Sequence, residues 1–406
     1  MLRAYKLRMY PTKREKKTLN RQMLLAKELY NLLLEKAKTH YKETNKTLSR
    51  NTMNLWITKL KVERNEFTEM YTQVLQNVAD RVSKAYSNFF KRVKEKGKGK
   101  KIKAGFPRAK TFVQSLTYPQ FGFIIIPNKK RIQVSNIGTV ETVFDREIEG
   151  KVKTLTIKKS RSLEWYACII VESEDKPFAS NDKEKIGVDL GIESFVTLSN
   201  GQKIENKRYE KKSSGKLRRL HRRVSRKLKG GNNRRKAVIK LARLSEHIAR
   251  QRNDYLNKIS HSLVNSYSLI VYEKLNINSM LKNHNIARSI NDVSWGNFIK
   301  MLCYKAESAG CRAIGVNPRN TSKMCNRCGS IKEMPLSERI FSCSACGIRI
   351  DRDINAARNI LNEGTAGHAG SNASGEVATT ATKIAASSLH ELGTIHGNCA
   401  IGNPCL

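Results

Sequence analysis

The chain has 406 residues, and its hydrophobic fraction of 39% is enough to build folded cores, which excludes wholesale disorder. It carries 77 Lys plus Arg against 35 Asp plus Glu, and this formal net charge of +42 predicts a polyanionic partner. The basic residues are spread along the whole chain rather than gathered on one amphipathic helix, so nucleic acid is favoured over an anionic membrane.

The N-terminal part of the chain is predicted to contain β and helical segments in turn. Residues 1–10 alternate polar and apolar side chains and predict a strand that ends at Pro11. Apolar residues recur at helical spacing between residues 12 and 95, and the basic run Lys94–Lys103 ends this helical block. Residues 105–175 hold short β-rich runs broken by turn residues. We expect the opening strand to join them, which makes the helical block an insert in a β domain.

A third region follows a polar linker at residues 175–185. Residues 186–204 contain two β-like runs, with an Asn200-Gly201 pair placed as a hairpin turn. Residues 207–252 hold 19 Lys or Arg against two acidic residues, and helical periodicity on either side of Gly230-Gly231 predicts two basic amphipathic helices. This excess is too large for an ordinary solvated face, so we expect phosphate contacts. We assign nucleic-acid binding to four residues of the first helix: Arg218, Arg219, Arg222 and Arg223.

The C-terminal part is predicted to alternate helices and strands before it loses its core-forming residues. Apolar spacing from Tyr255 to Tyr267 predicts another helix, followed by a strand over Ser268–Tyr272. A helix near 297–308 leads to a strand over 311–316. From Asn362 onward the chain is rich in Gly, Ala, Ser and Thr, which predicts a disordered tail.

Two cysteine pairs predict a structural zinc site. The pairs Cys325-x-x-Cys328 and Cys343-x-x-Cys346 each present two sulfurs from a tight turn, and together they match the four thiolates of a tetrahedral Zn²⁺ site. A glycine directly follows each pair, where the turn requires a permissive backbone. A site with four thiolates has no open position, so this zinc is structural rather than catalytic. The chain has nine cysteines and no visible secretory signal, which favours a reducing compartment inside the cell.

Acidic residues at the edges of three apolar elements predict a second metal site. Asp189 lies at the end of the first apolar strand of the third region, and Glu273 ends the strand Ser268–Tyr272. Asp351 and Asp353 open an apolar helical stripe. Buried carboxylates are costly unless cations neutralise them, and three that converge could hold two Mg²⁺ ions about 4 Å apart for phosphodiester hydrolysis.

The motif IGVDLG around Asp189 also opens sugar kinases and actin-like ATPases, where it contacts phosphate. Two observations count against that class. No second glycine-rich phosphate loop follows downstream, and such enzymes have no need of a charge of +42.

The order of motifs resembles the TnpB family, which is encoded by transposons and is related to the type V CRISPR effectors. The motifs are IGVDLG, LIVYEKLN, DVSWGNF, NPRNTSKMCNRCG, FSCSACG and DRDINAARNI, with KLRMYPTKREKKTLNR, AYSNFFKRVK and GFPR nearer the N-terminus. The resemblance covers roughly residues 1–362. It implies an RNA-guided DNA endonuclease that carries its own guide RNA and reads a short DNA motif beside its target.

The resemblance also implies a multidomain α+β fold, in which a zinc ribbon interrupts an RNase H-like (RuvC) nuclease domain and a helical insert interrupts an N-terminal β-barrel wedge domain. The implied boundaries are 1–10 with 104–180 for the wedge-like domain, 11–103 for the helical recognition insert, 184–320 with 350–362 for the nuclease domain, 321–349 for the zinc ribbon, and 363–406 for the disordered tail.

Carried over residue by residue, the resemblance makes Asp189, Glu273 and Asp353 the catalytic magnesium ligands. Asp351 is then expected to cap the helix by accepting the amide hydrogen of Asp353. The zinc ligands are the four paired cysteines, and Gln76 matches a position that reads the flanking DNA motif in relatives.

Three functions are consistent with these residues. The first is the RNA-guided endonuclease, in which base pairing to the guide supplies sequence specificity. The others are a non-catalytic zinc-ribbon protein that binds RNA and a transposase that uses the same carboxylates. The ordered acids argue against the RNA-binding protein, and the lack of a clear helix-turn-helix argues against the transposase. We expect a cytoplasmic, nucleoid-associated prokaryotic protein.

Overall fold

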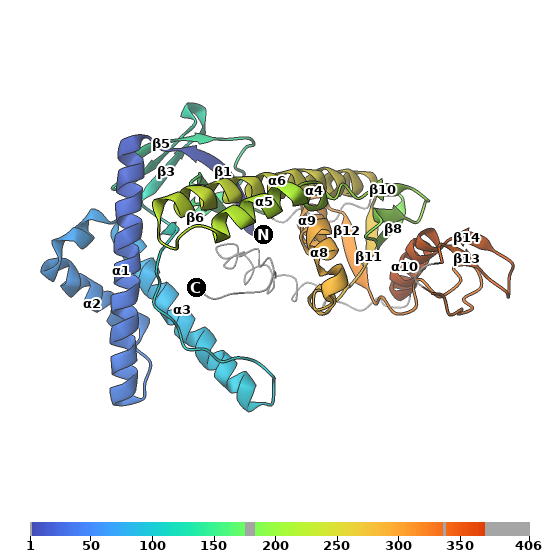
Figure 1. Ribbon diagram of the computed structural model, residues 1–406, viewed down its shortest axis with the longest axis horizontal. Coiled ribbons are helices and arrows are strands. Elements are labelled where there is room, and N and C mark those ends of the chain that lie inside the picture. The colour runs from blue at the N-terminus through green and yellow to red at the C-terminus, as the bar shows by residue number, and fades with distance from the viewer. Residues whose placement is uncertain (1, 175–182, 336–337, 370–406) are drawn as a thin grey trace. The chain divides into compact units, whose positions relative to one another are not determined.

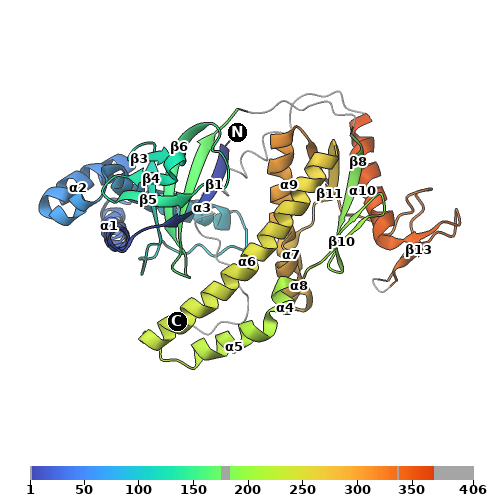
Figure 2. The ribbon, with the colours of Figure 1, turned by 90° about the horizontal axis from the view of Figure 1, so that it is seen from above.

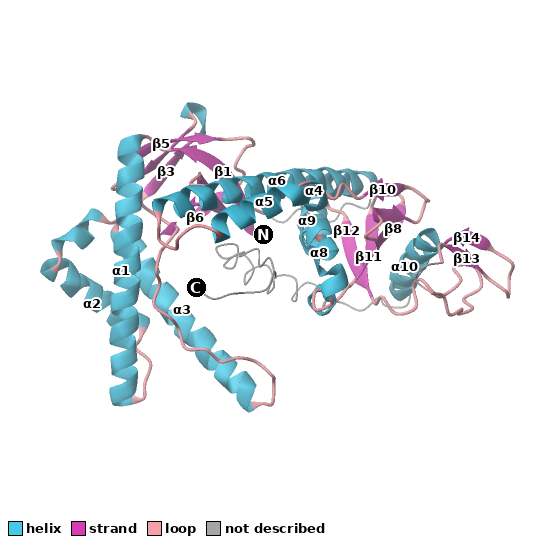
Figure 3. Cartoon of the chain, viewed as in Figure 1, coloured by secondary structure: helices cyan, strands magenta, loops and turns pink. Residues whose placement is uncertain are grey.

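The computed structural model describes residues 2–174, 183–335 and 338–369 (Figure 1). The chain divides into two compact units at the junction of Glu174 and Asp175. Each unit has its own sheet and its own helices (Figure 3). Among the described helices, none is both long enough and apolar enough to cross a membrane.

The first unit is built on a seven-stranded antiparallel sheet with the order β2-β6-β7-β1-β5-β4-β3. Its strands are β1 (Leu2–Tyr10), β2 (Ser115–Pro119), β3 (Phe123–Ile126), β4 (Arg131–Val134), β5 (Gly138–Val143), β6 (Lys151–Lys159) and β7 (Trp165–Glu172). Strand β1 pairs with β7 from Leu2 to Met9 and with β5 near its end, so the opening strand joins the later β-rich segment as predicted.

The predicted β-barrel is not fully closed. β2 and β3 are the two edges of the sheet, and no strand pairing joins them within residues 2–174. Alternate side chains of the central strands are buried, including Ala167, Ile169 and Val171 of β7, as expected for a sheet with one face in a core. The coarser prediction of a β domain that includes the opening strand is therefore confirmed, and full closure is not.

The helical block follows β1 and precedes β2, so it is an insert in the β domain. It contains α1 (Lys13–Thr44), α2 (Arg50–Glu63), a short 3₁₀ helix (Asn65–Glu69) and α3 (Thr72–Gly97). The first helix begins directly after Pro11 because Thr12 and Glu15 form a reciprocal cap, in which each side chain accepts the other's backbone amide hydrogen. It ends at Asn45, whose left-handed backbone (φ 53°) stops the helix.

The second unit contains a five-stranded sheet with the order β10-β9-β8-β11-β12. The strands are β8 (Lys185–Leu190), β9 (Ser194–Leu198), β10 (Lys203–Glu205), β11 (Leu269–Glu273) and β12 (Arg312–Val316). The first three are antiparallel neighbours, and β11 runs parallel to both β8 and β12. The turn between β9 and β10 contains Asn200 and Gly201 (φ 94°), which confirms the predicted hairpin.

The helices of the second unit differ from the prediction at one long segment. They are α4 (Tyr209–Lys212), α5 (Ser214–Ser225), α6 (Asn232–Ser266), α7 (Ile277–Met280), α8 (His284–Val293), α9 (Trp295–Ala309) and α10 (Arg352–Ala369). The predicted helix ending at Tyr267 is not separate from the second basic helix. Both belong to α6, because no glycine or proline interrupts residues 232–266.

Helix α10 lies against β8, β9 and β11, and two glycines allow the close approach (Figure 2). A Cβ atom on Gly187 of β8 would lie 2.0 Å from the backbone oxygen of Ala357. A Cβ atom on Gly364 would lie 2.5 Å from a methyl group of Val271 in β11. The tail prediction is therefore wrong for residues 363–369, because packing on the sheet extends the helix to Ala369. The remaining tail, 370–406, and the linker at 175–182 lie outside the described residues.

The segment between β12 and α10 carries both cysteine pairs. A bridge between Met324 and Ile331 and the short pair β13 (Ile340–Ser342) and β14 (Arg349–Asp351) form its framework. Strand β14 leads directly into α10. The segment that carries the cysteines therefore continues along the chain directly into the helix that carries Asp353.

Candidate active site and cysteine cluster

Asp189 and Glu273 lie at matching positions on neighbouring parallel strands. Val188 of β8 is paired with Tyr272 of β11, and the two acidic residues come next along their strands. Side chains at matching positions of parallel strands lie on the same face, with the strands about 4.8 Å apart. The register therefore brings these two carboxylates together at the carboxyl ends of the central strands.

Asp353 joins them from the first turn of α10, the helix that packs on β8. The electrostatics of Asp189 reflect this arrangement. Burial acts first, and then the nearby carboxylates of Glu273 and Asp353, and together they raise the pKa of Asp189 to about 8, although the Arg352 guanidinium opposes them. The three acids, which are far apart in the sequence, therefore share one electrostatic site.

Glu273 is the most deeply buried of the three, with an exposed fraction of 7%. Burial raises the pKa of Glu273, and a hydrogen bond donated by the Thr321 hydroxyl opposes this rise. Close to Asp353, the Arg352 Nε atom lies 3.6 Å from the Asp353 Oδ1 atom. Buried carboxylates in such proximity are stable as anions only with a compensating cation, so the donor set suits divalent metal ions that prefer oxygen ligands.

Asp351 has a different role from Asp353. Its Oδ1 atom accepts the backbone amide hydrogens of Asp353 (3.0 Å) and Ile354 (3.2 Å), and its Oδ2 atom lies 2.7 Å from Lys203 Nζ. Burial acts to raise the pKa of Asp351, but Lys203 and the two amides outweigh it and lower the pKa. These contacts occupy both oxygens of Asp351, so it serves as the cap of α10.

The four paired cysteines form a compact cluster. Their sulfur atoms all lie within 4.8 Å of one another, with Cys325–Cys346 and Cys328–Cys343 each separated by 3.6 Å. This separation is too long for a disulfide, and it is close to the roughly 3.8 Å between sulfurs that each lie about 2.3 Å from a tetrahedral zinc. In the part of the chain that the structure describes, no other group of potential ligands is gathered so tightly; the three carboxylates are more widely spaced.

Two tight turns hold the cysteines in this arrangement. Gly329 and Gly347 adopt left-handed backbones (φ 76° and 73°), and their amides donate to the carbonyl oxygens of Cys325 and Cys343. The Ser330 hydroxyl lies 3.0 Å from Cys343 Sγ, and hydrogen bonds from Ser330 and nearby amides lower the pKa of Cys343 to about 6. Cys343 therefore favours the thiolate, the form that binds metal. The Ile348 amide acts to lower the pKa of Cys346, but burial and the neighbouring cysteines outweigh it and raise that pKa to about 12.

The four arginines predicted to bind nucleic acid lie on a basic helical hairpin formed by α5 and α6 (Figure 2). Arg218, Arg219, Arg222 and Arg223 are all exposed on α5. Leu217, Leu220 and Val224 are half-buried on the opposite side of α5, as the predicted amphipathic pattern requires. Within the described residues, none of the four guanidinium groups has an ion-pair partner. Their charge is therefore available to an anion.

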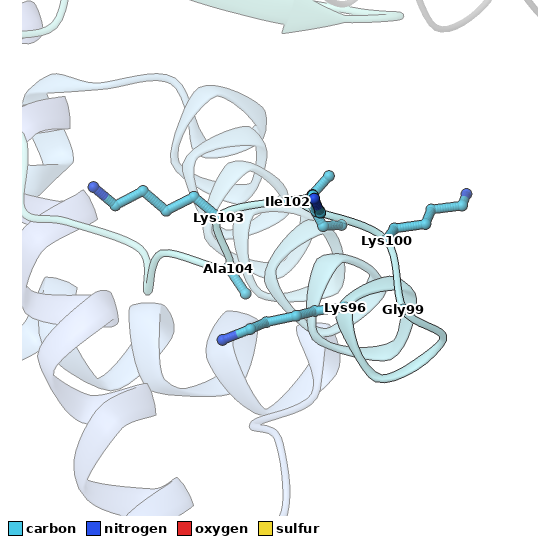
Figure 4. Close-up of a pocket in the computed structure, with 7 residues that line it drawn as sticks. Lys96, Gly99, Lys100, Ile102, Lys103 and Ala104 are labelled. Carbon is cyan, nitrogen blue, oxygen red and sulfur yellow. The ribbon is translucent and has the colours of Figure 1, made fainter.

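The first unit contains two further features of interest. Gln76 is half-buried on α3, in a helix whose buried stripe includes Val74 and Val78. An open hollow of about 600 Å³ lies where α3 ends, lined by Lys96, Gly99, Lys100, Lys101, Ile102, Lys103 and Ala104 (Figure 4). The lysine side chains extend in different directions rather than toward one point, which suits a polymeric anion better than a single small one.

Sequence reasoning missed three buried polar residues near the site: Thr321, which donates to Glu273, and Asn355 and Asn359, which bind the loop of Thr321. The two asparagines lie four residues apart in the motif DRDINAARNI, next to the apolar residues that form the buried face of α10. This placement could have predicted a buried hydrogen-bond network, because a buried side-chain amide requires hydrogen-bond partners.

Three family profiles match the chain. OrfB_IS605, described as "Probable transposase", matches residues 168–284, and a Cas12f1-like TNB domain matches residues 295–360. The third, described as a helix-turn-helix domain, matches residues 1–46. Residues 2–44 nevertheless form one strand and one unbroken helix, α1, so the described part of this match contains no helix-turn-helix geometry.

Two curated relatives align along almost the whole chain. "Putative RNA-guided DNA endonuclease" of Streptomyces pristinaespiralis is 32% identical over 376 residues, which cover 90% of each chain. "Putative RNA-guided DNA endonuclease InsQ" of Escherichia coli (strain K12) is 30% identical over 388 residues, covering 91% of this chain and 93% of its own. Among solved structures, the mini-RNA-guided endonuclease CRISPR-Cas_phi3 is similar with a TM-score of 0.47 and 11% identity, covering 92% of this chain and 93% of its own.

Proposed function

Because this chain belongs to the TnpB family of RNA-guided DNA endonucleases, we propose that it is a transposon-encoded, Mg²⁺-dependent endonuclease that hydrolyses DNA matched to a guide RNA. The observation that carries the proposal is the convergence of three carboxylates from β8, β11 and α10. Asp189 and Glu273 stand at matching positions of paired strands, and Glu273 and Asp353 add to the rise that burial causes in the pKa of Asp189. Such a convergence is typical of sites that hold metal for phosphodiester hydrolysis.

The topology of the second unit supports an RNase H-like (RuvC) nuclease domain. Three antiparallel strands are followed by two that run parallel to the first, and a helix packs over the central strand. The acids lie at the carboxyl ends of the two central strands, β8 and β11. The cysteine-bearing segment enters this domain between β12 and α10, which supports a zinc ribbon as an insertion.

Asp189, Glu273 and Asp353 are the proposed ligands of the catalytic metal. Two Mg²⁺ ions bound there would activate the attacking water and stabilise the leaving oxygen. Asp189 and Glu273 approach from rigid neighbouring strands, while Asp353 approaches from the first turn of a helix. Burial and the neighbouring carboxylates favour the protonated form of Asp189, and a bound divalent cation would favour its ionised form.

The zinc would be held by Cys325, Cys328, Cys343 and Cys346 and would have a structural role. The sulfur spacing and the two glycine turns fit a tetrahedral ion with no open position. Four sulfurs this close cannot all be thiolate without a cation, and a bound Zn²⁺ would supply the charge that lets all four ionise.

The guide RNA and the target DNA are the proposed partners. Base pairing with the guide would provide sequence specificity, while the protein contacts the phosphate backbone. The unpaired arginines of α5 and the lysine-lined hollow beyond α3 are the surfaces that support such contacts. Gln76 is the proposed reader of the flanking DNA motif, and a cytoplasmic, nucleoid-associated location follows from these partners.

Purification from the native host tests the proposal directly. We expect RNA of one defined size to co-purify with the chain, and the complex to cut DNA that matches this RNA when Mg²⁺ is present. Sequencing the RNA identifies the guide, and a mismatched DNA of equal length is the control. Defined RNA without cleavage would favour the RNA-binding protein, and strand transfer without guide dependence would favour a transposase.

The salt dependence of RNA binding tests the α5 surface. Replacing Arg218, Arg219, Arg222 and Arg223 together by Gln should flatten the log–log dependence of the binding constant on salt by up to about 3 units, because each lost phosphate contact on a single strand removes about 0.7. Replacing the same four residues by Lys keeps the charge and should preserve most of the slope. A slope that stays unchanged in the Gln variant would show that this surface faces solvent in the complex.

A further inference from the structure

A chain of buried hydrogen bonds connects the first cysteine pair with the Glu273 carboxylate. Thr321 is only 3% exposed, and its hydroxyl donates to the Oε1 atom of Glu273. It lies in the loop after β12, four residues before Cys325. This hydroxyl therefore fixes one side of a carboxylate that we assign to metal binding.

Two asparagines of α10 hold the loop that carries Thr321. Asn359 donates through Nδ2 to the backbone oxygens of Thr321 (2.8 Å) and Met324 (2.6 Å). Asn355 donates to Met324 O (2.7 Å) and accepts the amide hydrogen of Asn326 (3.0 Å). Asn326 directly follows Cys325, so the network extends from the cysteine cluster to α10.

Packing alone does not explain these polar residues. Asn355 and Asn359 are 0% and 1% exposed, respectively, and each stands where an apolar side chain of similar volume would cost less to bury. The main effect of a buried polar network in which every group is hydrogen-bonded is to fix one arrangement of the segments that it joins. Here those segments are the loop of Thr321 and the helix that begins with Asp353 at its first turn.

We propose that Thr321 is a positioning residue for the metal-binding carboxylate of Glu273, and that Asn355 and Asn359 hold Thr321 in place by tying its loop to the helix of Asp353. The inference rests on the proposed role of Glu273 as a magnesium ligand. It assigns a task to the buried polar residues between the cysteine cluster and the acids. The same network would fix the separation between the proposed ligands on β11 and α10.

The test is Mn²⁺ binding to the zinc-loaded, full-length chain freed of nucleic acid, measured by isothermal titration calorimetry. Thr321→Val keeps the shape of the side chain but removes its hydroxyl, and we expect Mn²⁺ to bind about 5- to 10-fold more weakly. Thr321→Ser retains the hydroxyl and should bind within about twofold of the wild type. Asn359→Leu should weaken binding in the same direction, because the loop loses both of its contacts with Nδ2.

Matched controls separate positioning from general damage. Ser322 and Asn362 are exposed neighbours on the same loop and helix, and Ser322→Ala and Asn362→Ala should leave Mn²⁺ affinity unchanged. Zinc content and melting temperature report whether each variant is folded. In the guide complex, Thr321→Val should raise the Mg²⁺ concentration for half-maximal cleavage far more than it lowers the rate at saturating Mg²⁺.

Two results would overturn the inference in distinguishable ways. If Thr321→Val binds Mn²⁺ as the wild type does while Glu273→Gln does not, the metal site stands and Thr321 has no positioning role. If Glu273→Gln also binds as the wild type does, the proposed metal site is wrong and the positioning role is lost with it.

Discussion

Alanine at Asp189, Glu273 or Asp353 should abolish cleavage of guide-matched DNA and leave guide RNA binding near the wild-type level. Each carboxylate would supply oxygen ligands to the metal ions, and the other two carboxylates alone cannot hold these ions in the same geometry. We therefore expect the cleavage rate to fall by at least about 10³-fold for each variant. None of the three belongs to the exposed basic surface that would contact phosphate. Cleavage and RNA binding measured side by side in Mg²⁺ provide the test.

Asp351→Ala is the matched control, because it removes a carboxylate from the same helical start. Its oxygens contact Lys203 and the first amides of α10, so its loss should cost about 1 kcal/mol of helix capping and reduce activity only mildly. An inactive Asp351→Ala beside an active Asp353→Ala would keep the mechanism and change the ligand. Full activity in Asp189→Ala or Glu273→Ala would refute the nuclease assignment.

The local elements were predictable because their signals are local. The alternation in residues 1–10 predicts β1, Thr12 with Glu15 marks the start of α1, and Asn200-Gly201 marks the hairpin between β9 and β10. The cysteine spacing likewise predicts a cluster, since two tight turns suffice to present four sulfurs. The strand, the helix cap, the hairpin and each single cysteine turn are determined by residues within a few positions of one another.

Features that depend on distant contacts were harder to predict. The extension of α10 to Ala369 depends on Gly364 meeting Val271, about 90 residues earlier in the chain. The amino-acid composition of the tail does not predict that contact. Closure of the first sheet also depends on whether β2 and β3 meet, which neither strand reveals alone.

The acidic site lies between these two cases. That Asp189 and Glu273 end apolar strands is visible in the sequence, but their shared face depends on the pairing of Val188 with Tyr272. The difference between Asp351 and Asp353 depends on Lys203, a residue of β10. The hydroxyl of Thr321 could not be assigned from its motif, because its partner Glu273 lies on β11, 48 residues earlier in the chain.

Loss of zinc is the second change for which we expect a large effect, and it should reduce DNA cleavage through the buried hydrogen bonds that join the cysteine cluster to Glu273. Cys325→Ser or Cys346→Ser removes one of four thiolates, and we expect the zinc content to fall from one ion per chain to nearly none. The control is Cys168→Ser, a half-buried thiol of β7 outside the cluster, which should retain one zinc. Metal analysis of freshly purified, reduced protein provides the measurement.

Cleavage should fall with the zinc, because the loop of Thr321 is continuous with the first cysteine turn. Asn355 binds the amide of Asn326 beside Cys325, and Asn359 binds the oxygen of Thr321, so a loosened turn releases the hydroxyl that fixes Glu273. We expect the Cys325→Ser variant to need more Mg²⁺ for half-maximal cleavage, as Thr321→Val does, and the double variant to be little worse than Cys325→Ser alone. Such non-additivity is what two substitutions on one contact path produce. If the losses of cleavage in the two single variants multiply in the double variant, zinc supports folding but does not influence the position of the carboxylates. A wild-type protein that contains no zinc would refute the metal assignment itself.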